Sequence, residues 1–268
     1  MDLTPVRTLF DRQLRREARA DGPGAVVERV GPVVRQTAPA SGWNGVLWSG
    51  FAPDDDPASV DAVIAEQVAH FGRAGVDFEW KAYGHDAPAF LGDRLTAAGF
   101  TAGERETVLV GESTALPAGV PLPPGVTLVP VTDAAGVEQV AEVHHAAFGT
   151  DSSRLRAHLL AQLAADSGTV AAVVALADGV PVSSARMEMY RGTDFAGLWG
   201  GGTVASWRSR GLYRALVSFR ARIAAEHGYR YLQVDAMETS RPILERLGFA
   251  ALGTTTPYEY ASARAERP

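Results

Sequence analysis

Apolar residues in the first half of the chain recur with helical spacing in some stretches and with strand spacing in others. The spacing predicts a helix that includes Val6 to Leu14, and a longer one that starts at Pro57 after an Asp56 cap and ends at Gly75. Further elements are predicted as strands at 25–30, 32–37, 46–49, 77–83 and 106–110 and a helix at 88–98. Helices and strands therefore alternate, which is typical of a mixed α/β fold.

The second half of the chain repeats this alternation. Strands are predicted at 126–130, 169–177, 180–190, 195–204, 231–236 and toward Tyr260, and helices at 134–148, 153–165, 211–227 and 241–247. Both halves end in the same order of helix, Gly, strand, helix with a nearby Pro, Gly-Phe and strand. The shared anchors are Gly75, Pro88 and Gly99-Phe100 in one half and Gly228, Pro242 and Gly248-Phe249 in the other. We interpret this order as a degenerate tandem repeat.

A proline-rich segment separates the two halves. Pro117, Pro121, Pro123 and Pro124 fall within eight positions, where they fix φ and remove amide donors. We therefore expect a first domain at 1–112, a linker at 113–125 and a second domain at 126–268.

Composition excludes several classes of protein. The chain has no cysteine, which excludes disulfides, thiolate metal sites and a cysteine nucleophile. The histidines show no metal-ligand spacing, so no metal is expected. A net charge of −6 gives no general attraction to nucleic acid or anionic lipid. The longest apolar run, Val170 to Ala177, is far below the roughly 20 residues that span a bilayer, and no signal peptide is evident, so we expect a cytoplasmic protein.

One candidate ligand site lies where a predicted strand leads through glycines into a predicted helix. Gly211 follows Arg208 and Arg210 and precedes Arg214, so three cations surround a turn where the backbone can approach a ligand closely. A helix start also offers free backbone N–H groups to a phosphate. The alternative is an ordinary helix start with solvated arginines.

At this turn the sequence resembles the GNAT superfamily of acyl-CoA N-acyltransferases, whose pyrophosphate loop has the pattern Gln/Arg-x-x-Gly-x-Gly/Ala. Arg208 and Gly211 match the first and fourth positions, whereas Tyr213 departs from the small sixth residue. The segment 240–249 is similar to the family's fourth helix and the turn after it. The resemblance covers 126–260 in element order, and with the repeat it implies two GNAT-like mixed β-sheet domains with flanking helices in tandem.

The resemblance implies transfer of an acetyl group from acetyl-CoA to an amine that attacks the thioester directly, which needs no cysteine and no metal. It also implies that pantetheine pairs with the edge of a splayed strand at 202–205. The expected cofactor-binding residues are Thr203, Val204, Ala205, Arg208, Ser209, Arg210, Gly211, Leu212, Tyr213, Arg214 and Ser240. The expected acceptor is a small-molecule or peptide amine, bound by a monomer or homodimer without nucleic acid or membrane.

The catalytic residues are less clear, because the family's usual tyrosine on the fourth helix falls at Leu244, which has no proton to give. Tyr213 is the candidate donor to the leaving thiolate, with two tyrosines near the C-terminus as substitutes of the same type. Glu188 and Asp235 are the candidate bases. Each has a structural alternative: Tyr213 belongs to the core or to the rim, Glu188 lies on a solvated strand face, and Asp235 caps the turn into the short helix. His144 and His145 point about 100° apart on a predicted helix, so at most one faces a pocket.

The corresponding junction of the first half carries carboxylates instead of arginines. Asp54, Asp55 and Asp56 should repel a pyrophosphate and instead cap the following helix. We therefore expect a first domain that has lost acyl-CoA and shapes or covers the acceptor site. The alternatives for the whole chain are a catalytically silent acyl-CoA-binding sensor or interaction module, and a structural protein without cofactor.

Overall fold

The computed structural model describes residues 2–39, 42–117, 119–165 and 168–262 and divides the chain into two compact units. The first unit comprises 1–108, 235–239 and 251–268, and the second comprises 109–234 and 240–250. Residue 118 of the expected linker and residues 263–268 of the expected second domain lie outside the described residues.

The units differ from the linear boundaries expected at 112 and 126. Strands β6 (Glu106–Glu112), β11 (Tyr231–Ala236) and β12 (Ala250–Tyr260) each contribute residues to both units. Most of β12 belongs to the first unit because it pairs antiparallel with β4 (Phe78–Tyr83), from Thr255 opposite Tyr83 to Tyr260 opposite Phe78. Apolar spacing predicts a strand but not the sheet that receives it.

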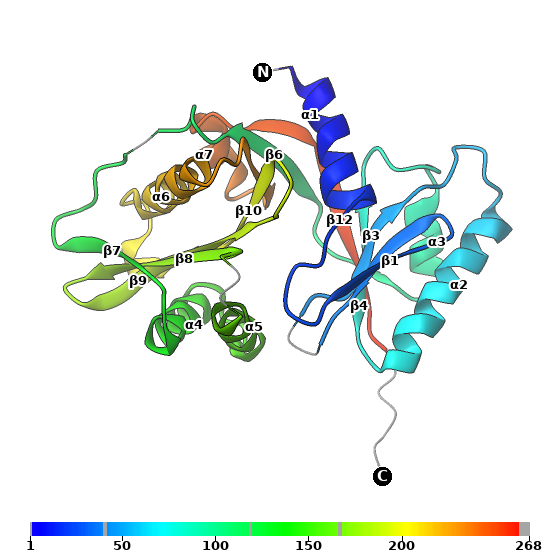
Figure 1. The fold of residues 1–268 in the computed structure, drawn as a ribbon, viewed down its shortest axis with the longest axis horizontal. Coiled ribbons are helices and arrows are strands. Elements are labelled where there is room, and N and C mark those ends of the chain that lie inside the picture. The colour runs from blue at the N-terminus through cyan, green and yellow to red at the C-terminus, as the bar shows by residue number, and fades with distance from the viewer. Residues whose placement is uncertain (1, 40–41, 118, 166–167, 263–268) are drawn as a thin grey trace, which may run out of the picture. The chain divides into compact units, whose positions relative to one another are not determined.

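The first unit is built on the strand order β1-β2-β3-β4-β12, and β5 also pairs with β12. Figure 1 labels β1, β3, β4 and β12 of this unit. Its other elements are α1 (Leu3–Phe10), the π-helix η1 (Asp11–Arg16), β1 (Val26–Val30), β2 (Val33–Thr37), β3 (Gly45–Ser49), α2 (Pro57–Ala74), α3 (Leu91–Ala97) and β5 (Thr101–Ala102). Asp56 caps α2 through the amides of Ala58 and Ser59, and Gly75 ends it with φ +65°, as the sequence predicts. Phe71 of α2 stacks on Phe78 of β4 and closes the core of this unit.

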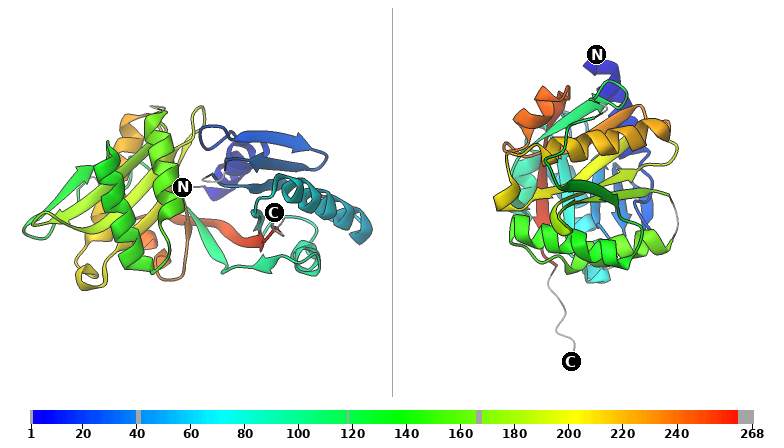
Figure 2. Two further views of the ribbon diagram at one scale, coloured as in Figure 1. Left: turned by 90° about the horizontal axis from the view of Figure 1, so that it is seen from below. Right: turned by 90° about the vertical axis from the view of Figure 1, so that its left-hand side faces the viewer.

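The second unit is built on the strand order β6-β11-β10-β9-β8-β7. Its elements include β7 (Val126–Pro130), α4 (Ala134–Phe148), α5 (Ser153–Ala164), β8 (Val170–Ala177), β9 (Val180–Met189), β10 (Phe195–Thr203), the 3-10 turn η2 (Ala205–Trp207), α6 (Leu212–Glu226) and α7 (Arg241–Arg246). Helices α4 and α5 cover one face of the sheet and α6 covers the other (Figure 2). Successive side chains of β9 point to opposite faces of the sheet. Met187 is fully buried on one face, and Glu188 points toward α5 on the other.

Candidate functional site

Strands β10 and β11 are paired only at their beginnings. Their parallel ladder joins Phe195 to Tyr231, Ala196 to Leu232 and Gly197 to Gln233 and goes no further. Strand β10 continues to Thr203 along β9, with a register shift between Trp199 and Gly202, where Gly200 has φ +57°. The edge of β10 beyond Gly197 is therefore not paired with β11.

Glycines leave both faces of this opened edge without side chains of their own. A Cβ built on Gly201 would lie 2.9 Å from the ring of Tyr213, and one on Gly202 would lie 2.8 Å from the ring of Phe148. Tyr213 comes from α6 and Phe148 from the end of α4, so side chains from the two helical layers approach the same stretch of strand. Larger residues at either position would collide with these rings.

The chain turns from η2 into α6 through two residues with positive φ. Ser209 has φ +62°, which is uncommon for a residue with a side chain, and Gly211 has φ +84° at the N-cap of α6. Gly211 provides no side chain to cap the helix, and the first intrahelical bond runs from the Ala215 amide to the Gly211 carbonyl. The amides of the first turn, Leu212 included, have no intrahelical acceptor, and this arrangement favours an anion near the start of the helix.

The three arginines of the loop are all exposed. Arg208 donates to the carbonyls of Thr203 and Ala147, both at 3.2 Å, and so ties the loop to the ends of β10 and α4. The guanidinium of Arg210 lies over the ring of Trp207 at 4.6 Å. Arg214 turns back toward Gly211, with Nη2 3.4 Å from the position of a Cβ there. The structure therefore brings together the turn, its free amides and three cations, as the sequence predicts.

The expected pantetheine edge at 202–205 differs in detail from the structure. Thr203 ends β10 and its hydroxyl pairs with that of Ser183 at 2.8 Å. The amide of Val204 donates to the carbonyl of Val182 on β9, and Ala205 begins the 3-10 turn. The Val204 amide is therefore not free for a ligand, and the unpaired edge lies before it on β10.

Tyr213 crosses from the first turn of α6 toward the start of α7. Its ring lies against Gly201, and its hydroxyl hydrogen-bonds with Ser240, the N-cap of α7. Burial raises the pKa of the phenol, although Arg220 and the hydrogen bond with Ser240 act in the opposite direction. Tyr213 is therefore a protonated donor at neutral pH, and its ring occupies the space beside the opened strand.

Glu188 lies on the opposite face of the same sheet. Its carboxylate is 3.3 Å from Nε of Arg186 and 3.8 Å from Nε2 of His158 on α5, and only 12% of its side chain is exposed. Burial alone would raise the pKa of Glu188, but His158 and Arg186 outweigh burial and hold the pKa below its usual value. Glu188 opposes Gly197 in the β9–β10 register, one residue before the strand leaves β11. The solvated strand face considered from the sequence is therefore not its environment.

Asp235 is paired within the first unit. Its carboxylate forms an ion pair with Lys81 of β4, the one lysine of the chain, and only 2% of its side chain is exposed. Asp235 outweighs the burial of Lys81 and holds the pKa of that ammonium well above its usual value. Nearby, the pKa of Glu106 is raised to about 7, mainly by burial and secondly by the charge of Asp235. The structure thus pairs the carboxylate of Asp235 with a cation of its own unit.

Sequence comparisons find no relatives: no family model matches the chain, and no curated protein matches it. Solved structures do match. A GCN5-related N-acetyltransferase from Kribbella flavida superposes with a TM-score of 0.70 and 21% identity, covering 96% of this chain and 95% of that one. A tandem GNAT protein from the clavulanic acid biosynthesis pathway gives a TM-score of 0.61 and 13% identity over 93% and 87%. A GCN5-related N-acetyltransferase from Sphaerobacter thermophilus gives 0.59 and 15% over 87% and 82%.

The chain has the GNAT fold. The resemblance inferred from the arginine loop is confirmed at the level of fold, as are the tandem architecture and the mixed α/β class. In this GNAT fold, Leu244 of α7 is fully buried and carries no titratable group, so the position expected for the family's tyrosine is part of the core.

The corresponding turn of the first unit has a different chemistry. Asp55 accepts from the amide of Ala52 at 2.8 Å, and Asp56 caps α2 while the hydrogen bonds from Ser59 lower the pKa of its carboxyl. The helix end that could bind an anion is therefore occupied by carboxylates of the chain itself, as the sequence predicts.

Two residues near the site were missed in the sequence. Arg220 of α6 is 1% exposed, and His158 of α5 contacts Glu188. Helical spacing places Arg220 on the buried stripe that includes Leu216, four residues earlier, and this is the signal that could have revealed it.

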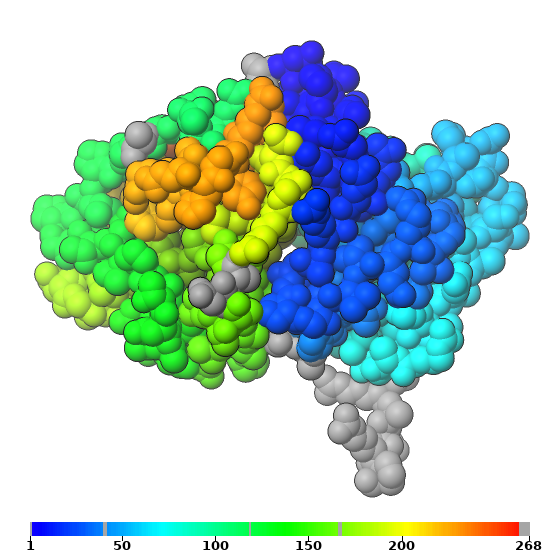
Figure 3. Space-filling view, in the orientation of Figure 1, coloured from blue at the N-terminus to red at the C-terminus, as the bar shows by residue number. Residues whose placement is uncertain are grey.

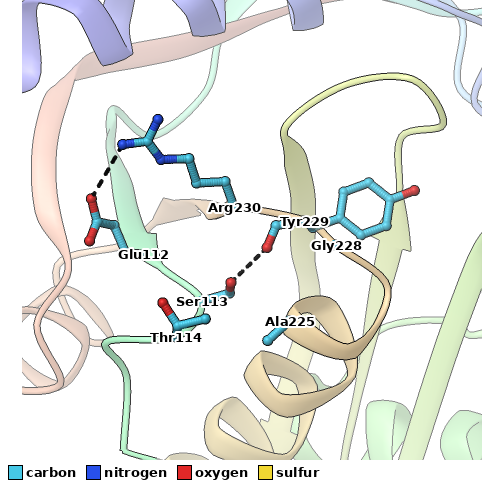
Figure 4. Close-up of a pocket in the computed structure, with 7 residues that line it drawn as sticks. All are labelled: Glu112, Ser113, Thr114, Ala225, Gly228, Tyr229 and Arg230. Atoms are coloured by element: carbon cyan, nitrogen blue, oxygen red, sulfur yellow. Dashed lines mark hydrogen bonds and ion pairs between the residues drawn. The ribbon is translucent and has the colours of Figure 1, made fainter.

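A shallow cavity lies apart from the arginine loop, at the turn between α6 and β11 (Figure 4). It has a volume of about 240 Å³ and is lined by Glu112, Ser113, Thr114, Ala225, Gly228, Tyr229 and Arg230. The hydroxyl of Ser113 donates to the carbonyl of Tyr229 at 2.6 Å and already satisfies a polar group there. The cavity is smaller than typical ligand pockets and contains none of the expected site residues.

Among the described residues, no group of His, Cys, Asp or Glu is arranged to hold a metal ion. Within the same residues, no helix has the length and apolarity needed to cross a membrane.

Proposed function

We propose that the chain is an N-acetyltransferase that moves the acetyl group of acetyl-CoA to a primary amine, and that the second unit binds the acetyl-CoA. The observation that carries this proposal is the opened edge of β10 followed by the uncapped start of α6. These features present unpaired backbone and free amides in succession, as an extended ligand with a terminal polyphosphate requires.

The residues of the loop suit the diphosphate of acetyl-CoA. Gly211 has no side chain to block the amides, and Arg208, Arg210 and Arg214 supply charge to phosphate oxygens. Arg208 uses two of its five donors on carbonyls and keeps the rest for a ligand. We assign the diphosphate to this loop and the pantetheine arm to the β10 edge before Val204.

Glu188 and Tyr213 are the groups we assign to proton transfer. Acetyl-CoA supplies a thioester that an amine attacks directly, so the protein must accept one proton and provide another. Glu188 is ionised at neutral pH and lies on the α5 face, whereas Tyr213 is protonated and lies on the α6 face. The glycine-rich strand β10 lies between the proton acceptor and the proton donor. Asp235 becomes a structural ion-pair partner in this assignment.

A second candidate function is a catalytically silent acyl-CoA sensor. It is favoured by the ring of Tyr213, which packs against Gly201 and bonds to Ser240 in the space beside the opened strand. A sensor would bind acetyl-CoA and release no CoA.

Thiol release distinguishes the two functions. The chain has no cysteine, so a thiol reagent detects only free CoA and no protein background. The protein is incubated with acetyl-CoA and a panel of polyamines, aminoglycosides and peptides with free N-termini, and the parent is compared with Gly211→Val. Amine-dependent thiol release that Gly211→Val abolishes supports the transferase. Binding of acetyl-CoA by calorimetry without release by any amine supports the sensor, and absence of binding contradicts both functions.

A further inference from the structure

Arg220 is a buried cation with an unusual set of partners. Only 1% of the residue is exposed, and within the described part of the chain no Asp or Glu forms an ion pair with it. Its Nε donates to the carbonyl of Leu216 at 3.0 Å, and Nη1 donates to the carbonyl of Arg186 at 2.8 Å. These two neutral acceptors fix the guanidinium between α6 and β9.

The third nitrogen of the guanidinium points to the opened strand. Nη2 lies 3.9 Å from the position that a Cβ on Gly201 would take, and the ring of Tyr213 lies 2.9 Å from the same point. The guanidinium of Arg220 and the ring of Tyr213 therefore both lie next to Gly201 of β10, and each group influences the pKa of the other.

A buried charge without a counterion is costly for the fold. Burial lowers the pKa of Arg220 to about 10; the phenol of Tyr213 opposes this change, and the charge of Arg186 on β9 adds to it. The side chain still carries its proton at neutral pH, so the fold keeps a positive charge at this point without a carboxylate to balance it. The two carbonyl acceptors of Arg220 are neutral, and a neutral donor could also bond to them. An anion that forms next to Arg220 during the reaction would instead be stabilised by its positive charge.

We propose that Arg220 is a positioning residue that stabilises the negative charge left when Tyr213 gives its proton to the departing CoA sulfur. This inference rests on the proposed acetyl transfer. It also accounts for Leu244, because the proton donor then comes from α6 and its electrostatic partner comes from two turns further along the same helix.

The step balances without another reagent. The amine nitrogen forms a bond to the thioester carbonyl carbon, and the carbon–sulfur bond breaks with its electron pair on sulfur. Sulfur takes the proton of the Tyr213 hydroxyl, while the proton lost by the amine passes to Glu188. Tyr213 is a phenolate beside Arg220 until solvent returns a proton to it and Glu188 loses one.

The test compares Arg220→Met, which removes the charge and keeps the length, with Arg220→Lys, which keeps the charge. Arg222→Met is the matched control on the same helix, because half of the Arg222 side chain is exposed. Helix α6 is the orange segment at the surface in Figure 3. Tyr213 is titrated by NMR in protein with ¹³C-labelled tyrosine, and its signal is assigned with Tyr213→Phe. Thermal unfolding shows whether each variant is folded.

In Arg220→Met we expect the pKa of Tyr213 to rise by about 1 to 3, the usual effect of an adjacent opposite charge. We expect kcat to fall about 10- to 100-fold, with KM for acetyl-CoA within about twofold and the alkaline limb of the kcat profile moved to higher pH. Arg220→Lys should recover most of kcat, and Arg222→Met should resemble the parent.

A folded Arg220→Met variant with an unchanged Tyr213 titration overturns the inference, as does an unchanged kcat and pH profile. Loss of stability alone, with the Tyr213 titration unmoved, assigns Arg220 to the fold only and also overturns it. If the parent transfers no acetyl group to any amine, the proposed function fails instead, and the NMR titration still reports whether Arg220 and Tyr213 are coupled.

Discussion

Gly211→Val tests the arginine loop, because Gly211 combines φ +84° with the N-cap of α6. An L-residue in this region costs about 1 to 2 kcal/mol, and a branched side chain also stands over the free amides of the first turn. For a chain of this size, 1 kcal/mol corresponds to roughly 2 to 4 °C in Tm, so we expect a fall of about 2 to 8 °C. Calorimetry should show loss of acetyl-CoA binding in a folded variant.

Gly228→Val provides the control for this prediction. Gly228 follows the other end of α6 with φ +80°, and within the described part of the chain no heavy atom beyond its two sequence neighbours lies within 4 Å of its Cβ position. The conformational cost of Gly228→Val should therefore match that of Gly211→Val, while acetyl-CoA binding should match the parent. Equal binding by both variants, or equal loss from both, would refute the placement of the diphosphate at Gly211.

Three further predictions concern charged groups. Glu188→Gln should lower kcat by about 10² to 10⁴ if Glu188 accepts the amine proton, and kinetics with one confirmed acceptor would show this. Lys81→Met should lower the free energy of unfolding by about 3 to 5 kcal/mol, since it leaves Asp235 buried without its cation, and urea unfolding should show a smaller loss when Asp235→Leu is added. The raised pKa of Glu106 means that the folded chain holds this proton more tightly than the unfolded chain does. The stability contributed by Glu106 therefore falls as pH rises from about 4.5 through about 7. Glu106→Gln should remove that fall when the free energy of unfolding is measured at about pH 5 and about pH 8.

The sequence predicted most of the secondary structure, because caps and apolar spacing act locally. Asp56 and Gly75 delimit α2 as expected, and the turn at Gly211 has the positive φ that its residue type allows. The two-residue strand β5 and the π-helix η1 were not predicted, since a strand of two residues has no measurable periodicity and a π-helix does not follow the 3.6-residue spacing.

The candidate site was only partly predictable, because its remaining determinants are contacts between distant residues. Lys81 and Asp235 are 154 positions apart, and no local pattern indicates that they form an ion pair. The buried Arg15 illustrates the same limit, because it donates two hydrogen bonds of 2.7 Å to Asp86, which lies 71 positions away in the sequence. The residues of the arginine loop are close in sequence, so their arrangement could be predicted. The partners of buried charges are set by tertiary packing and could not be predicted from local sequence.

Hydrogen exchange with and without acetyl-CoA tests the central claim most directly, because it locates the bound ligand on the full chain. The account predicts slower exchange for the amides of 198–203 and 209–214, with no change at 50–59, where Asp55 and Asp56 already occupy the turn. Slower exchange at 50–59, or unchanged exchange at 209–214 with acetyl-CoA saturating, would contradict a single acetyl-CoA site at the start of α6.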